Sequence, residues 1–165
     1  VGLIVRLPGN PLPLIWESTP LENVPDQELG KGKSGAQLVS LKERLENYET
    51  NVYAIRFLKV VRDPSMLNHL FRFISYAHTL PFPGELRLVG KVIHAKIFSR
   101  LYRMKRRYKN IFCSELVAES YMVMGLLPEV PPPSAYMPVD FSTQKKLPLL
   151  KGAHLSGEFM ISFEK

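Results

Sequence analysis

The sequence predicts a mixed fold of helices and strands, of the α+β class, on three observations. Apolar, strand-like runs occupy 1–6 and 159–163. Apolar residues recur at helical spacing in 64–78 and in 112–124. The chain has 165 residues, 45% of them apolar, and a mean hydropathy of -0.05. It can therefore bury a substantial core, and we expect residues 1–165 to form one domain.

The helix expected at 64–78 has clear boundaries. Asp63 is a favourable N-cap, Pro64 suits the first helical position, and the Pro-Phe-Pro-Gly string at 81–84 stops the chain from continuing as a helix. We also expect a short helix at 41–48 and another at about 88–102. Pro and Gly residues between 23 and 35 indicate an exposed loop.

The helix expected at 112–124 begins at Cys113, the single cysteine of the chain. Asn110 can cap it and Gly125 can close it in a left-handed conformation. A thiol in the first turn faces unpaired backbone N–H groups and the positive end of the helix dipole, and both favour the nucleophilic thiolate. This placement is expected of a nucleophile in a cysteine hydrolase or acyltransferase, although a lone cysteine is more often core filler. Its inward face is expected to carry four apolar residues, Leu116, Val117, Tyr121 and Met124.

The same helix carries a recognisable string. It begins with Phe-Cys-Ser-Glu-Leu-Val-Ala, at 112–118, and ends with Gly-Leu-Leu, at 125–127. This pattern resembles the nucleophile helix of the permuted papain-like cysteine amidases and peptidases, the YiiX-like branch of the NlpC-type superfamily. In that family a strand with the catalytic histidine, typically reading His-Val-Gly, comes first, and the nucleophile helix comes late. The resemblance implies a circularly permuted papain-like fold, with a small antiparallel sheet packed against the nucleophile helix.

Other segments extend the resemblance. The run 1–6 is similar to the family's first strand, starting directly after its histidine. The run 14–20 resembles the second strand, which would make Glu17 the third member of the catalytic triad. The runs 35–41 and 52–56 resemble the strands that follow. The chain departs from the family in one respect, because no histidine precedes Glu17.

Two explanations of the missing base are open. The sequence can begin just after the family's histidine, or this member can have lost it. The start inside an apolar strand, at Val1 and without Met, favours the first explanation. The four histidines present are His69, His78, His94 and His154. Of these His154 is the best substitute base, because it lies in a glycine-flanked loop before a strand.

A cluster of positive charge precedes Cys113. Nine Lys and Arg residues and no Asp or Glu lie between 87 and 109, in a chain of net charge +7. We call its dense end the basic stripe, formed by Arg100, Arg103, Lys105, Arg106, Arg107 and Lys109. The stripe can be a plain solvated face or can contact an anionic ligand or membrane surface. Nucleic acid is a less favoured partner, since only Tyr102 and Tyr108 offer stacking groups there.

Several classes of site are not indicated by the sequence. One cysteine cannot form an internal disulfide, and no Cys or His residues have the spacing of metal ligands. We therefore expect no metal and no cofactor. No apolar run is long enough for a membrane-spanning helix. A location in the cytoplasm or at the membrane periphery is slightly favoured, and the oligomeric state is not indicated.

The resemblance implies an acyl-transfer mechanism. The Cys113 thiolate would attack an amide, ester or thioester carbonyl, and water or an acceptor would resolve the acyl-enzyme. Glu17 would orient the histidine, and backbone N–H groups at the helix start, including that of Cys113, would bind the oxyanion. The expected substrate is a small molecule, a lipid or a peptide. The alternative is an inactive papain-like module that binds an anionic membrane or a protein partner through the basic stripe.

Overall fold

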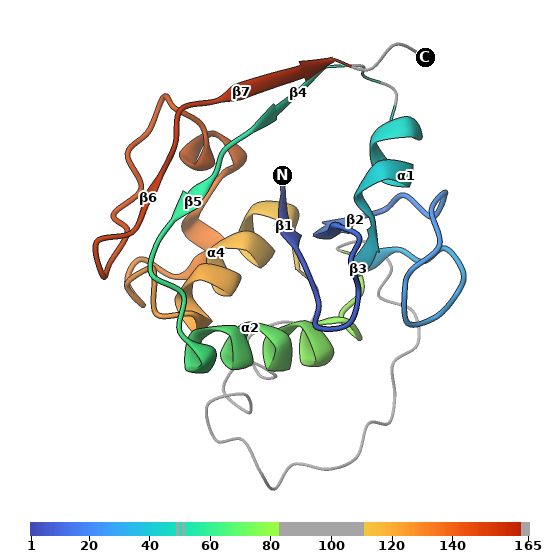
Figure 1. Ribbon diagram of the computed structural model, residues 1–165, viewed down its shortest axis with the longest axis horizontal. Coiled ribbons are helices and arrows are strands. Elements are labelled where there is room, and N and C mark those ends of the chain that lie inside the picture. Colours follow the sequence, from blue (N-terminus) through green and yellow to red (C-terminus); the bar gives the residue numbers. More distant parts are fainter. Residues whose placement is uncertain (49, 51, 83–110, 163–165) are drawn as a thin grey trace, which may run out of the picture.

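Short groups of strands and helices follow one another along the chain in the computed structural model, which describes residues 1–48, 50, 52–82 and 111–162 (Figure 1). The strands are β1 (Gly2–Val5), β2 (Leu14–Thr19), β3 (Gly35–Ser40), β4 (Val52–Ile55), β5 (Leu58–Lys59), β6 (His154–Leu155) and β7 (Phe159–Ser162). The helices are α1 (Leu41–Glu46), α2 (Pro64–Ala77) and α4 (Cys113–Val123), with 3-10 turns η1 (Pro133–Ala135) and η2 (Pro138–Phe141). The structure is therefore α+β, as predicted. The helix expected at about 88–102 lies outside the described residues.

The main sheet is antiparallel, in the order β1–β2–β3. Its register pairs Gly2 with Glu17, and Glu17 with Gln37. Successive residues of a strand point to opposite faces, so Leu3, Trp16 and Leu38 line the core face of this sheet. The opposite face carries Glu17 and Gln37. Two further antiparallel pairs, β4–β7 and β5–β6, form separate ribbons.

Helix α4 is the centre of the fold (Figure 1). It contacts β1, β2, α2 and η1, and every residue from 114 to 122 is buried. The apolar residues predicted to face inward are buried, but so are the polar ones between them, because α4 is covered on all sides. Phe112, not Asn110, is the N-cap. Gly125 adopts the predicted left-handed conformation, with φ of 69°, and ends the helix.

Helix α2 packs one face on this core. Its predicted N-cap is confirmed, since an Asp63 carboxylate oxygen accepts the backbone N–H of Met66 at 2.8 Å. Phe73 meets the buried Trp16 edge to face, with the ring centroids 6.3 Å apart. The His78 ring stacks on the same indole at 6.5 Å. The indole therefore joins the main sheet to both the middle and the end of α2. Among the described residues, no helix is long and apolar enough to cross a bilayer.

The loop between β2 and β3 was predicted to be exposed, and at its centre this is wrong. Asp26 is 1% exposed and accepts the backbone N–H of Leu38 at 2.9 Å. The same carboxylate oxygen lies 2.7 Å from Nε2 of His78, the C-cap residue of α2. The Lys33 ammonium donates to the carbonyl oxygens of His78 and Ala36. The loop is thereby fastened to β3 and to the end of α2.

Asp26 should make the free energy of unfolding depend on pH below about pH 5. Burial raises its pKa, but hydrogen bonds from His78 and from backbone N–H groups outweigh burial and lower it from 3.8 to about 2. The folded state therefore binds this proton less readily than the unfolded state. The stabilisation is complete above about pH 5 and is lost as pH falls toward 2. We expect a loss of about 1 kcal/mol between pH 5 and pH 3, measured by urea unfolding.

The matched control is Asp26→Asn, which cannot ionise. The difference in unfolding free energy between the native chain and this variant should shrink by the same amount over that range. A difference that stays constant from pH 5 to pH 3 would show that Asp26 does not titrate as described.

Candidate functional site

Cys113 lies at the open end of an otherwise buried helix. It is the first residue of α4 and is partly exposed, whereas Ser114 is buried. The preceding Phe112 is extended, with φ of -82° and ψ of 163°, so the chain turns sharply into the helix. The Phe112 N–H donates to the Glu115 carboxylate at 3.3 Å. The thiol is thus accessible at the end of the helix where backbone N–H groups point outward.

The start of α4 is tied to the second strand of the main sheet. The buried Ser18 hydroxyl donates to the carbonyl oxygen of Ile111 at 2.6 Å. Ser18 directly follows Glu17 on β2, and Ile111 lies two residues before Cys113. This contact fixes the entry to α4 beside the part of β2 that carries Glu17.

Glu17 is held by a buried ion pair. Its side chain is 3% exposed, and Oε1 lies 2.5 Å from Nε of Arg44. Its other oxygen accepts the Tyr48 hydroxyl at 3.2 Å. Arg44 also donates to Gln37 Oε1 at 2.9 Å and to Asn23 Oδ1 at 2.6 Å. The Glu17 cluster, meaning Glu17, Gln37, Arg44 and Tyr48, is therefore a hydrogen-bonded unit joining β2, β3 and α1.

Tyr48 has a raised pKa within the Glu17 cluster. Burial raises the pKa of Tyr48, and the charge of Glu17 and its hydrogen bond raise it further, while Arg44 acts in the opposite direction. The phenol is therefore protonated at neutral pH and donates its O–H to the Glu17 carboxylate.

Gly2 lies directly beside Glu17 in the main sheet. The two residues pair, and a Cβ at position 2 would lie 2.8 Å from Ile15 Cδ1 and 3.2 Å from Glu17 Cβ. Only a residue without a side chain fits there unless Ile15 shifts. The Ile15 side chain therefore occupies the space that a side chain at position 2 would take.

The described histidines lie elsewhere. His69 is exposed on α2. The ring of His78 is enclosed by Asp26 and Glu28, with Nδ1 3.3 Å from the Glu28 carboxylate. His154, the predicted substitute base, is exposed on β6 and lines a pocket that includes neither Cys113 nor Glu17. His94 and the basic stripe (Arg100, Arg103, Lys105, Arg106, Arg107 and Lys109) fall outside the described residues.

The structure joins Glu17 to Arg44 and Tyr48, and sequence reasoning missed both of these partners. Arg44 lies among charged neighbours on a short helix, a pattern typical of a solvent-facing surface. The sequence offered one local indication of a contact between these two residues, because they are four positions apart and can lie on one side of a helix. In the structure the Arg44 Cζ lies 5.7 Å from the Tyr48 ring centroid.

Within the described part of the chain, no group of three or more His, Cys, Asp or Glu side chains is arranged to hold a metal ion. No protein-family model, curated protein or solved structure matches this chain.

The buried ion pair can be tested by removing one partner. Arg44→Met should lower the unfolding free energy by about 3 to 5 kcal/mol, because it leaves the Glu17 carboxylate buried without a cation. Adding Glu17→Gln to that variant should recover at least half of the loss, since the amide still accepts from Tyr48 and carries no charge. Urea unfolding at pH 7 measures both changes.

Lys42→Met is the matched control, because Lys42 lies on the same helix and its ion pair with Glu46, at 3.8 Å, is exposed. This variant should change stability little. An Arg44→Met variant no less stable than Lys42→Met would contradict the structural role given to the Glu17–Arg44 pair.

Proposed function

We propose that this chain forms a permuted papain-like domain of a cysteine-dependent hydrolase or acyltransferase, with Cys113 as the nucleophile. One observation carries the proposal. The accessible thiol lies at the start of α4, and α4 packs against β1 and β2, the second of which carries the buried Glu17 carboxylate. The chain order is compatible with a permuted fold, because the sheet strands β1 to β3 precede the nucleophile helix.

The strand register is compatible with a catalytic histidine directly before Val1. Gly2 pairs with Glu17, so a residue preceding Val1 in an extended strand would stand opposite Thr19. Its side chain would share the face of Gly2 and Glu17, since alternate residues of a strand point the same way. Diagonal neighbours on one face lie within reach of a long or aromatic side chain. A histidine there could donate to the Glu17 carboxylate alongside Tyr48.

The proposed chemistry follows from these positions. The Cys113 sulfur attacks the carbonyl carbon of an amide, ester or thioester, and the carbonyl oxygen becomes an oxyanion. Backbone N–H groups at the start of α4, including that of Cys113, stabilise it. The histidine takes the thiol proton as the C–S bond forms, and the oxyanion then collapses, which breaks the bond to the leaving group while the imidazolium gives its proton to that group. Water or an acceptor then attacks the thioester and releases the thiol.

Glu17 would hold the histidine tautomer and stabilise the imidazolium. Its rigid attachment to Arg44 and Tyr48 suits this task, because a positioning carboxylate must not move during the reaction. The Tyr48 phenol, kept protonated by its surroundings, adds a neutral donor at the edge of the site. The basic stripe predicted from the sequence favours a substrate with a lipid or acyl-amide group near an anionic surface.

Adding a histidine directly before Val1 tests the proposal. Two chains would be compared, one preceded at Val1 by Thr-Val-Thr-His and the other by Thr-Val-Thr-Ala. We expect the first to hydrolyse p-nitrophenyl butyrate at least about 100-fold faster at pH 7, because a positioned general base contributes that much or more. Cys113→Ser should abolish the difference, and Glu17→Gln should reduce it. Circular dichroism checks that each chain is folded.

Equal rates for the two folded chains would overturn the catalytic proposal. They would leave the inactive binding module as the better account of this fold. The alanine-preceded chain controls for any effect of lengthening β1.

A further inference from the structure

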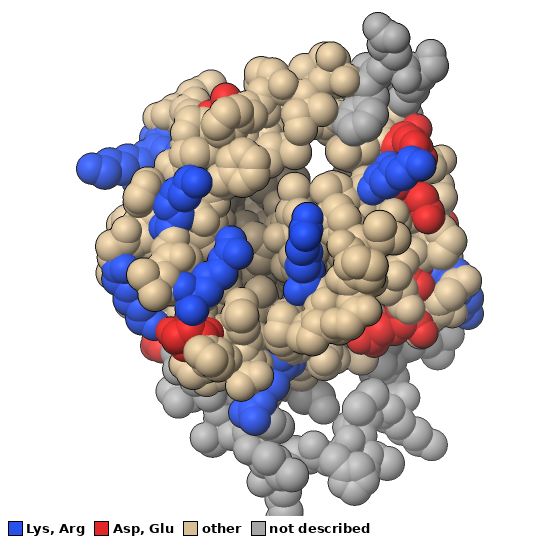
Figure 2. Space-filling view, viewed as in Figure 1, with Lys and Arg blue, Asp and Glu red and all other residues tan. Residues whose placement is uncertain are grey.

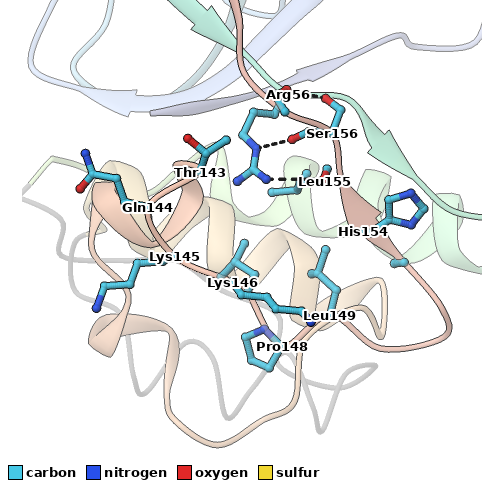
Figure 3. A pocket seen from close by; sticks show the side chains of 13 residues that line it. Arg56, Thr143, Gln144, Lys145, Lys146, Pro148, Leu149, His154, Leu155 and Ser156 are labelled. Atoms are coloured by element: carbon cyan, nitrogen blue, oxygen red, sulfur yellow. Dashed lines mark hydrogen bonds between the residues drawn. The ribbon is translucent and has the colours of Figure 1, made fainter.

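A cavity lies away from Cys113 and the Glu17 cluster. It has a volume of about 640 Å³ and is walled by the junction of β4 and β5, the segment 143–149, and the segment 153–157 that contains β6 (Figure 3). Neither Cys113 nor any member of the Glu17 cluster lines it. Its function is therefore separate from the proposed acyl-transfer site.

The lining of this pocket is basic. Arg56, Lys145, Lys146 and His154 contribute to it, and none of the lining residues is Asp or Glu. Figure 3 shows Arg56 on one side of the pocket and Lys146 on the other, with the Lys145 side chain directed outward. On the face seen in Figure 2, Lys and Arg side chains surround a hollow, while Asp and Glu lie toward the edges. Next to the pocket, the Glu158 carboxylate accepts the backbone N–H of Thr143 at 2.8 Å, so the cations of the lining outnumber this one carboxylate and attract anions.

The Arg56 guanidinium is fixed in place. Its Nε donates to the Ser156 carbonyl oxygen at 2.7 Å, and Nη1 donates to the carbonyl oxygens of Phe141 and Ser142 at 2.9 and 2.7 Å. Nη2 lies 3.5 Å from the Leu155 carbonyl oxygen. These neutral acceptors orient the group without neutralising its charge. Four of the five N–H donors of the guanidinium are thus engaged, so it offers an anion its positive charge and one remaining N–H.

Polar and apolar groups complete the lining. Thr143, Gln144 and Ser156 offer neutral polar side chains. Leu147, Pro148 and Leu149 form an apolar wall, and Ala153 and Leu155 add to it. A ligand that matches both parts has an anionic head and a short apolar stem.

We propose that this pocket binds a small organic anion, in which a phosphate or carboxylate head lies near Arg56, Lys145 and Lys146 and an apolar stem lies along Leu147 and Leu149. The two head groups share the same recognition chemistry, which is charge-assisted hydrogen bonding to guanidinium and ammonium donors.

The probes are butyl phosphate, butyrate and, as a neutral control, butanol. Each is titrated into the isotopically labelled chain, and the backbone amide signals of Thr143 and Gly157 are followed by NMR. We expect saturable shifts at these signals with at least one of the two anions, and none with butanol. Comparison of butyl phosphate with butyrate identifies the preferred head group. The absence of a saturable shift with both anions up to about 20 mM would overturn the proposal.

Lysine variants distinguish anion binding in this pocket from anion binding to positive charge elsewhere on the surface. A Lys145→Gln, Lys146→Gln double variant should weaken anion binding about tenfold or more, because it removes two of the cations that line the pocket. Lys42→Gln, an exposed lysine on α1, is the matched control and should bind as the native chain does. Arg56→Gln removes four backbone contacts as well as the charge, so the lysine variants provide the test. Equal affinity in the double variant and the native chain would overturn the proposal, whatever the result at Cys113.

Discussion

The buried pair of Glu17 and Arg44 is the constraint on which the site depends. Two charges removed from water are costly unless further hydrogen bonds satisfy them. Here Gln37, Asn23 and Tyr48 supply those bonds, so the ion pair requires β2, β3, α1 and the loop before β3 to take one arrangement. The same requirement sets the position of Tyr48, whose hydroxyl donates to Glu17. The position of the Glu17 carboxylate is therefore determined by a polar cluster inside the fold.

The packing of α4 complements that cluster. A helix buried on all sides cannot rotate or slide without displacing its neighbours, so its first residue is as fixed as its centre. The hydroxyl of Ser18 adds a direct tether between β2 and the residue at the entry to the helix. Cys113 combines accessibility with an immobile backbone, which is the combination that a nucleophile requires.

Local patterns predicted much of this architecture and part of the site. The Asp63 cap, the Pro64 start and the Gly125 stop depend on neighbouring residues, so they could be read from the chain. The start of α4 at Cys113 was predicted because a helix start is also a local feature of the chain. Asp26, Arg44 and Tyr48 were missed because their burial arises from contacts with residues distant in the chain. A charged side chain in a short segment suggests exposure, and only tertiary structure shows the partner that permits burial.

Arg56 has a consequence for how the chain moves. The ribbons β4–β7 and β5–β6 each have two strands, and such ribbons are marginally stable alone. One guanidinium contacts the carbonyl oxygens at the end of η2 and those of β6 and the residue after it. Local opening of β6 therefore cannot occur without releasing the end of η2. These segments, far apart in the sequence, should exchange their amide hydrogens as a single cooperative unit.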